Sequence, residues 1–402
     1  MADLPQELVD LIMDELQDDQ STLIACSLAS RSFYHPSRRY IFRQISLGPN
    51  SVDAFNTIIA ASPDIPSHVH ELSIKRGMRM HKDWAVYSDV LPDIITKCTN
   101  LRRLHLSKIL WRKAPVPTLR SALENTNVTF LDIKSCRFTN YNDAALFFSH
   151  FPQLKRLSIS GSLAEDDSLD CLRRLRLRQW SAPTKIVLDE LDVDLMEGIN
   201  VVSFLVMSDH VFALRRLRVF QWDSCDDSDM LGIRVILRAA ALKHVGVGRC
   251  CCDRHRAPID IQRLQSLTIS FTNYSEGILP AWITVFQNTP AACPLKVLTF
   301  LIVINWECEL STLSHKEPWI ALDAALTRKE FSGLRRVVFK ISFVRNTPFM
   351  IVGAAKGAIE ASCTRLASAG IMSVEVSNEP IRDEYDGRLR RYWLHEEVPD
   401  YY

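Results

Sequence analysis

The chain has 402 residues, of which 47% are hydrophobic and 24% charged, as in a globular protein of about two to three domains. With 48 basic and 47 acidic residues the formal net charge is +1, which gives no electrostatic reason to expect nucleic acid or an anionic membrane as a partner. The acidic start MADLPQELVD lacks a secretory h-region, and no apolar run reaches ~18 residues, so we expect a soluble intracellular protein, cytoplasmic and/or nuclear.

The first 42 residues predict three short helices. In the segment 4–16, LPQELVDLIMDEL, Pro5 suits a first helical turn and the apolar residues recur every three or four positions. Residues 18–21, DDQS, break this pattern and can cap a second helix that carries Leu23 and Leu28. A third helix begins near Ser30 or Ser32, with Pro36 tolerated only in its first turns. So small a core is stable only when it packs on something else.

About a dozen positions in this segment match a known motif in order and spacing. They are Leu4-Pro5-x-Glu7-Leu8, Ile12, Leu16, Leu23, Cys26-Ser27-Leu28, Arg31, Phe33, Arg38 and Phe42. The segment resembles an F-box of the form common in fungal proteins. It departs from the family at Phe42, where a Trp is usual, and its second and third helices follow the fungal rather than the animal pattern. The other interpretation is a generic amphipathic helical cap.

The resemblance implies a motif that docks on a Skp-type adaptor and, through it, on a cullin–RING ubiquitin ligase. It assigns the adaptor-facing surface to Leu4, Pro5, Leu8, Ile12 and Leu16. Leu23 and Leu28 would support that surface from the second helix.

A pattern apolar-x-x-apolar-x-apolar then recurs about every 22 to 39 residues. Its middle position is assigned to Ile45, Leu72, Leu104, Leu131, Leu157, Ile186, Leu217, Val245, Leu267, Leu298, Val337 and Val374. The alternation is that of strands with one buried face, and many intervals carry helix-period stretches. Such units bury their apolar faces only by stacking on their neighbours.

Residues 98–108 and 151–161 look like leucine-rich repeats, although the characteristic Asn ladder is replaced by Lys108, Cys136 and Gly161. We therefore predict an α/β fold in which a three-helix F-box (1–47) leads into a curved, leucine-rich-repeat-like solenoid (48–377) with irregular loop insertions. No Gly/Ser linker separates the two, so the junction should be rigid. Residues 378–402 form a C-terminal cap or a tail.

Nothing in the sequence predicts catalysis, a cofactor or a metal. Phosphate loops, nucleophile elbows and paired His-Glu helix motifs are missing, and the acidic clusters near 165–167, 189–194 and 223–229 lack the pattern of a Ca²⁺ loop. The 11 cysteines read as reduced thiols. One cluster, at 250–255 (CCCDRH), has no second ligand pair, so a Cys-rich loop is favoured over a zinc site.

The remaining positions of the strands should line an exposed concave face. Among the outward residues of the assumed register, basic ones outnumber acidic ones, which favours an acidic or phosphorylated client segment; arginines that merely fill solvated positions are the alternative. The candidate client-binding residues are Arg103, Arg156, Arg216, Arg218, Phe220 and Arg336.

The sequence thus predicts a substrate-recognition subunit of a Skp–cullin–F-box ubiquitin ligase, with transfer chemistry on other subunits. The alternative is a non-ligase interaction protein whose F-box recruits only the adaptor or is vestigial. A nucleic-acid or membrane binder is disfavoured because the arginines alternate with acids and lack stacking aromatic pairs.

Overall fold

The computed structural model describes residues 4–48, 50–75, 90–111, 117–161, 163–164, 185–194, 201–208, 211–223, 227–239, 241–247, 261–272, 278–290, 292–304, 315–343, 347 and 349–377. The chain folds as two compact units, Met1–Arg216 and Leu217–Tyr402. Both are mixed α/β, with parallel strands that follow one another in chain order. The predicted α/β class is therefore confirmed. The Cys-rich cluster at 250–255 and the C-terminal segment 378–402 lie outside the described residues.

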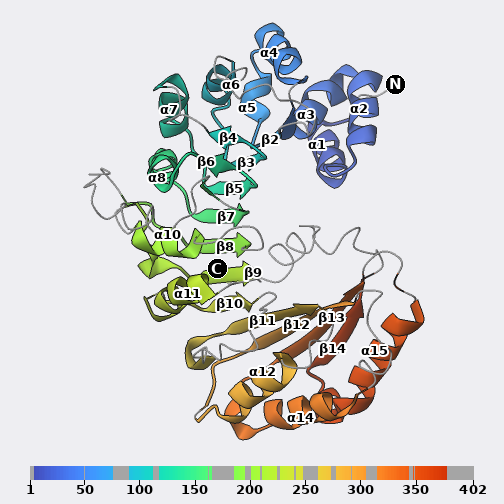
Figure 1. Ribbon diagram of the computed structural model, residues 1–402. Coiled ribbons are helices and arrows are strands. Elements are labelled where there is room, and N and C mark those ends of the chain that lie inside the picture. The colour runs from blue at the N-terminus through green and yellow to red at the C-terminus, as the bar shows by residue number, and fades with distance from the viewer. Residues whose placement is uncertain are drawn as a thin grey trace. The chain divides into compact units, whose positions relative to one another are not determined.

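In the first unit (Figure 1), three helices precede alternating strands and helices. The helices are α1 (Gln6–Glu15), α2 (Gln20–Ala29), α3 (Arg31–Ile41), α4 (Val52–Ala61), α5 (Ile65–His68), α6 (Leu91–Lys97), α7 (Pro117–Glu124), α8 (Tyr141–Phe148) and α10 (Val201–Met207), with a 3₁₀ turn at Leu214–Arg216. The strands are β1 (Gln44–Leu47), β2 (Glu71–Lys75), β3 (Arg103–Ser107), β5 (Phe130–Lys134), β7 (Arg156–Ser160) and β8 (Glu190–Asp194), and a small second sheet pairs β4 (Leu110–Trp111) with β6 (Arg137–Phe138).

The second unit repeats the arrangement, with longer strands at β11, β12 and β13. Its strands are β9 (Val219–Asp223), β10 (His244–Val247), β11 (Ser266–Thr272), β12 (Val297–Ile304), β13 (Arg336–Phe343) and β14 (Met372–Val376). Its helices are α11 (Asp227–Ala239), α12 (Ile278–Gln287), α14 (Glu317–Leu326), α15 (Phe349–Ser362) and α16 (Thr364–Ser368), with 3₁₀ turns at Ile261–Arg263 and Lys329–Phe331.

Side chains just outside the helices decide where the N-terminal helices begin. The Asp19 carboxylate accepts a hydrogen bond from the Thr22 N–H at 3.0 Å, and the Ser30 hydroxyl accepts one from the Ser32 N–H at 3.2 Å. The predicted capping of the second helix is therefore confirmed. Pro36 is buried at the sixth position of α3, deeper in the helix than expected, where it removes one backbone donor from the helical ladder.

The hydrogen-bonded register confirms most of the predicted repeat. Leu72, Leu104, Leu131 and Leu157 are direct partners on successive strands of the first unit, and all are buried. In the second unit the same relation joins Val245, Leu267, Leu298 and Val337 in one buried row. These residues form the apolar side of the strands, which the helices cover (Figure 1).

Three middle positions were assigned wrongly. The partner of Leu157 is Leu191 rather than Ile186, and the partner of Val245 is Phe220 rather than Leu217. At the last strand Met372, not Val374, lies opposite Val337, a shift of two residues that keeps the same face inward.

One backbone feature recurs before the strands. The carbonyl of the residue that precedes a strand accepts hydrogen bonds from two N–H groups at the start of the next strand. Arg43 O accepts from His70 N and Glu71 N, both at 3.0 Å. His70 O accepts from Arg102 N at 2.9 Å and Arg103 N at 3.0 Å. The start of each of these strands is thus fixed against its neighbour, whatever the length of the connection between them.

Candidate docking surfaces

The three N-terminal helices have apolar residues on two sides. Val9 and Met13 of α1 pack with Leu23 of α2 into a small buried core, supported by partly buried Leu16 and Phe33. One turn of an α-helix takes 3.6 residues, so side chains at i, i+3 and i+4 share a face. Leu8, Leu11 and Ile12 share such a face, and it points away from the core.

This outer face, with Leu4 one turn before it, is called the α1 surface below. Leu4 is 48% exposed, Leu8 46%, Leu11 60% and Ile12 39%. Four large apolar side chains in sequence on one short segment are more than the scattered single exposures normal for a protein surface. The arrangement suits an apolar partner groove.

The structure separates the predicted adaptor-binding residues into two groups. Leu4, Pro5, Leu8 and Ile12 are exposed, whereas Leu23 is buried and Leu16 is half-buried against the core. Leu28 does not support the surface from beneath: it is 82% exposed, because five residues of helix turn it about 140° from Leu23. Leu11 and Ile24, which is also exposed, were not assigned to the site.

Polar contacts fasten α3 to what precedes and follows it. The Tyr40 hydroxyl donates to the Asp14 carboxylate of α1, and this hydrogen bond raises the pKa of Tyr40. Arg38 lies 3.4 Å from Asp64, next to α5, and its guanidinium stacks 5.0 Å from the ring centre of Tyr34. The helical segment is therefore attached directly to the first strand–helix unit.

The second candidate surface is the strand face opposite the helices in the first unit. Its charges are paired between neighbouring strands: Arg103 lies 3.7 Å from Glu71, and Arg156 lies 3.0 Å from Glu190. His105 stands between Glu71 at 3.1 Å and Asp132 at 3.0 Å. Burial alone would lower the pKa of His105, but its contacts with Asp132 and Glu71 raise it overall.

The predicted excess of basic residues on this face was wrong, because the corrected register adds Glu190 and Asp192 to it. Counting only residues whose side chains the structure describes, the face of β2 to β8 carries four cations and four carboxylates, namely Lys75, Arg103, Lys134 and Arg156 with Glu71, Asp132, Glu190 and Asp192. In the second unit Arg336 lies 3.2 Å from Glu375.

The other three client-binding candidates do not lie on an exposed strand face. Arg216 is exposed in the 3₁₀ turn Leu214–Arg216, and Arg218 is half-buried just before β9. Phe220 is fully buried and stacks on Trp222 at 5.0 Å between ring centres, because the true register turns it inward. Of the six candidates, Arg103, Arg156 and Arg336 therefore lie on an exposed strand face.

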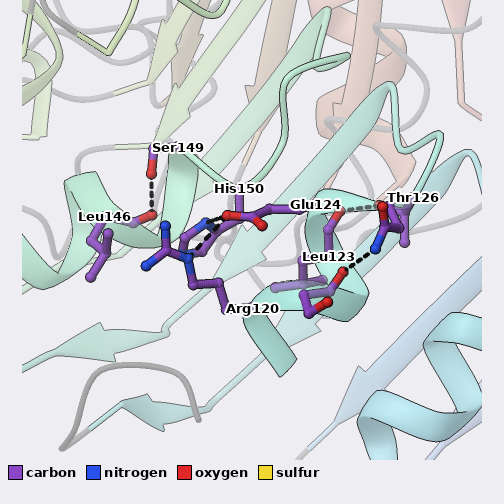
Figure 2. A network of polar contacts seen from close by, with 9 residues as sticks. Arg120, Leu123, Glu124, Thr126, Leu146, Ser149 and His150 are labelled. Carbon is purple, nitrogen blue, oxygen red and sulfur yellow. Dashed lines mark hydrogen bonds and ion pairs between the residues drawn. The ribbon is translucent and has the colours of Figure 1, made fainter. Parts of the chain in front are cut away.

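A polar network of the buried His150 with the exposed Arg120 and Glu124 joins α7 to the chain after α8 (Figure 2). The Glu124 carboxylate lies between Arg120 Nε at 3.0 Å and His150 Nδ1 at 3.1 Å. The Nε2 atom of His150 has no hydrogen-bond partner among the described residues. Burial is the main cause that lowers the pKa of His150, which favours the neutral form of the ring.

No known family or function follows from comparison with other proteins. No family model matches the chain, and no curated protein matches it. Among solved structures, a structural-genomics protein from Bacteroides fragilis is similar with a TM-score of 0.34 and 12% identity, over 83% of this chain and 73% of that one. At that TM-score the likeness carries no argument.

Within the described ranges, none of the helices combines the length and apolarity that crossing a membrane requires. In the same ranges, His, Cys, Asp and Glu side chains do not gather in threes that could hold a metal ion. Among the cysteines described there, burial raises the pKa of Cys98, Cys136 and Cys363 to about 12.

Proposed function

We propose that this chain is the substrate-recognition subunit of a Skp–cullin–F-box ubiquitin ligase. Its N-terminal helices act as an F-box that docks the adaptor, and the strand–helix units act as a leucine-rich-repeat-like solenoid that holds the client protein. The observation that carries the proposal is the α1 surface, in which leucines of a small helical unit face solvent while Val9 and Met13 supply its core.

The energetics of that surface agree with a docking role. Burying a leucine side chain fully contributes about 1.5–3 kcal/mol, so covering four half-exposed apolar side chains contributes a few kcal/mol in total. The direct attachment of α3 to α5 would transmit the position of the adaptor to the client-binding part. The chain would act by bringing the client to ubiquitin-transfer subunits rather than by chemistry of its own.

The test is co-expression with a Skp-type adaptor, comparing the parent chain with the Leu8→Asp variant. A charge placed in the α1 surface would lose its hydration on binding. The parent should therefore form a stoichiometric complex with the adaptor, and the Leu8→Asp variant should not. Ile58→Asp on α4 is the matched control, because Ile58 is 43% exposed, close to the 46% of Leu8. The control should still co-elute with the adaptor.

A folded parent chain that does not co-elute with the adaptor would refute the F-box role. Loss of the complex in both variants would show a general effect of added charge and remove the support from the α1 surface. Adaptor capture without cullin would favour the alternative, an interaction protein that does not assemble a ligase.

A further inference from the structure

In the second unit, the residues that precede the strands form a regular row. They are Arg218, Lys243, Gln265, Lys296 and Arg335, called the edge row below. The carbonyl of each of the first four accepts hydrogen bonds from two N–H groups at the start of the next strand, at 2.8–3.2 Å. The backbone carbonyls of these four residues are thus occupied by internal hydrogen bonds, so a partner would contact the row through side chains.

The edge row is strongly cationic. Lys243, Lys296 and Arg335 are exposed, and in the part of the chain that the structure describes none of the three forms an ion pair. Between them stands Gln265, which adds a hydrogen-bond donor without a negative charge. They differ in this from Arg103, Arg156 and Arg336, each of which pairs with a carboxylate on a neighbouring strand.

The neighbouring histidine reports the same positive potential. The pKa of His244, which follows Lys243, is lowered first by burial and then by the charges of Lys243 and Arg218. Like charges held this close repel one another and weaken folding slightly, so an opposite charge bound along the row would relieve them.

Stabilisation of helix ends does not account for the row. Cations favour the C-terminus of a helix, but the effect falls off within its last turn. α12 ends at Gln287 and α14 at Leu326, whereas Lys296 and Arg335 come nine residues after those ends. These two side chains therefore lie beyond the reach of the preceding helix in the sequence.

We propose that the edge row is a docking site for an extended, carboxylate-rich segment of a partner protein. Neighbouring strands are about 4.8 Å apart, so the five positions span about 19 Å, the length of roughly six extended residues. A peptide is favoured over nucleic acid because the row contains no aromatic side chain for base stacking and the formal net charge is only +1. The inference rests on the proposed function only in calling that partner a client.

The test uses the full chain and a fluorescein-labelled peptide with a run of about six glutamates, the length that matches the row. Binding is measured by fluorescence anisotropy at low salt for the parent and for a Lys243→Glu, Lys296→Glu, Arg335→Glu variant. The control variant carries Arg234→Glu, Lys316→Glu and Arg365→Glu, three exposed cations of helices α11 and α16 and of the α14 cap. Each reversal removes two charge units, so both variants go from +1 to −5.

The edge variant should bind the peptide about tenfold or more weakly than the parent, and the control within about twofold. Equal losses in the two variants would reduce the effect to net charge and overturn the site, as would unchanged binding in the edge variant. If the reversals disturb folding by circular dichroism, glutamine replacements at the same three positions make the same comparison.

A second probe separates the classes of partner. A glutamine peptide of the same length should not bind, and a single-stranded oligonucleotide should compete weakly. Tight oligonucleotide binding that depends on Lys243, Lys296 and Arg335 would overturn the assignment to a protein segment. These assays contain no adaptor, so loss of the adaptor complex and loss of peptide binding are independent results.

Discussion

The surroundings of two histidines of the first unit shift their pKa values in opposite directions, raising that of His105 and lowering that of His150. His105 lies between the carboxylates of Glu71 and Asp132, whereas His150 is buried against Glu124 with Arg120 close to the same carboxylate. A histidine whose pKa is raised by folding stabilises the protein below its ordinary value of about 6.5, and this contribution is lost as pH rises through the folded pKa. His150 has a lowered pKa, so its contribution is lost as pH falls.

Histidine-selective NMR titration of the full chain should therefore show His105 titrating above the ordinary value and His150 below it. His105→Gln and His150→Gln assign the two signals. The stability cost of His105→Gln should be larger at about pH 5.5 than at about pH 8.5, and that of His150→Gln should show the reverse. Titration of both rings at the ordinary value would contradict the geometry described here.

At the scale of single elements, the turns that follow three strands share a backbone conformation. Lys108, Ser135 and Gly161 come directly after β3, β5 and β7, and all have positive φ, at 60°, 48° and 89°. The N–H of Lys108 donates to Lys134 O at 2.8 Å, and that of Ser135 donates to Ser160 O at 2.6 Å. The turn thus repeats after successive strands, at or next to the positions where the sequence lacks the asparagine ladder of leucine-rich repeats.

The third of these turns strongly favours glycine. A Cβ on Gly161 would lie 3.2 Å from the Ser135 Cα, in addition to the strain of φ +89°. Gly161→Ala should therefore destabilise the first unit by about 1–3 kcal/mol. Ser135→Gly should be close to neutral or stabilising, since it removes the left-handed strain of a non-glycine residue. Thermal melts of both variants make the comparison, and an unchanged melting temperature for Gly161→Ala would show that the turn relaxes.

The strand pattern was predictable from sequence except where it overlaps itself. At Leu214-x-x-Leu217-x-Val219 and at Leu217-x-x-Phe220-x-Trp222 the same apolar spacing occurs twice, three residues apart. Only pairing with β10 decides between them, and it selects Phe220. The α1 surface was largely predictable from helical spacing. The edge row is also visible in the sequence, since a basic residue directly follows the first apolar position in most repeats. Only the hydrogen bonds between strands show that these residues occupy equivalent positions on neighbouring strands.

At the scale of the whole molecule, hydrogen bonds between strands connect each strand–helix repeat mainly to the repeats before and after it in the chain. Stability in such an arrangement is close to a sum of local terms. In the second unit Phe300 of β12 stacks on Phe339 of β13, with ring centres 5.1 Å apart, and Trp319 of α14 packs edge-on to Phe339 at 5.7 Å. A destabilising substitution in this aromatic cluster should therefore affect mainly the neighbouring repeats.

Phe300→Ala should cost about 3–5 kcal/mol in the second unit. Amide hydrogen exchange should rise in β11 to β13, while protection in α1 to α3 stays as in the parent. The proposed adaptor binding should also survive, because the α1 surface lies in the other compact unit. Equal loss of protection in α1 to α3 would show instead that the chain unfolds as one cooperative body.

The doubly accepting carbonyl that precedes many of the strands has a consequence for length variation. Because His70 O accepts hydrogen bonds from the N–H groups of Arg102 and Arg103, the register of β3 against β2 is fixed at its first residues. The register therefore does not depend on the residues that connect the two strands. A foreign sequence inserted into such a connection would leave the register of the strands unchanged. A single residue inserted between Leu101 and Leu104 would instead reverse the inward and outward faces of the strand. The architecture thus confines permissible insertions to the connections, where new binding specificity can be added without disturbing the frame.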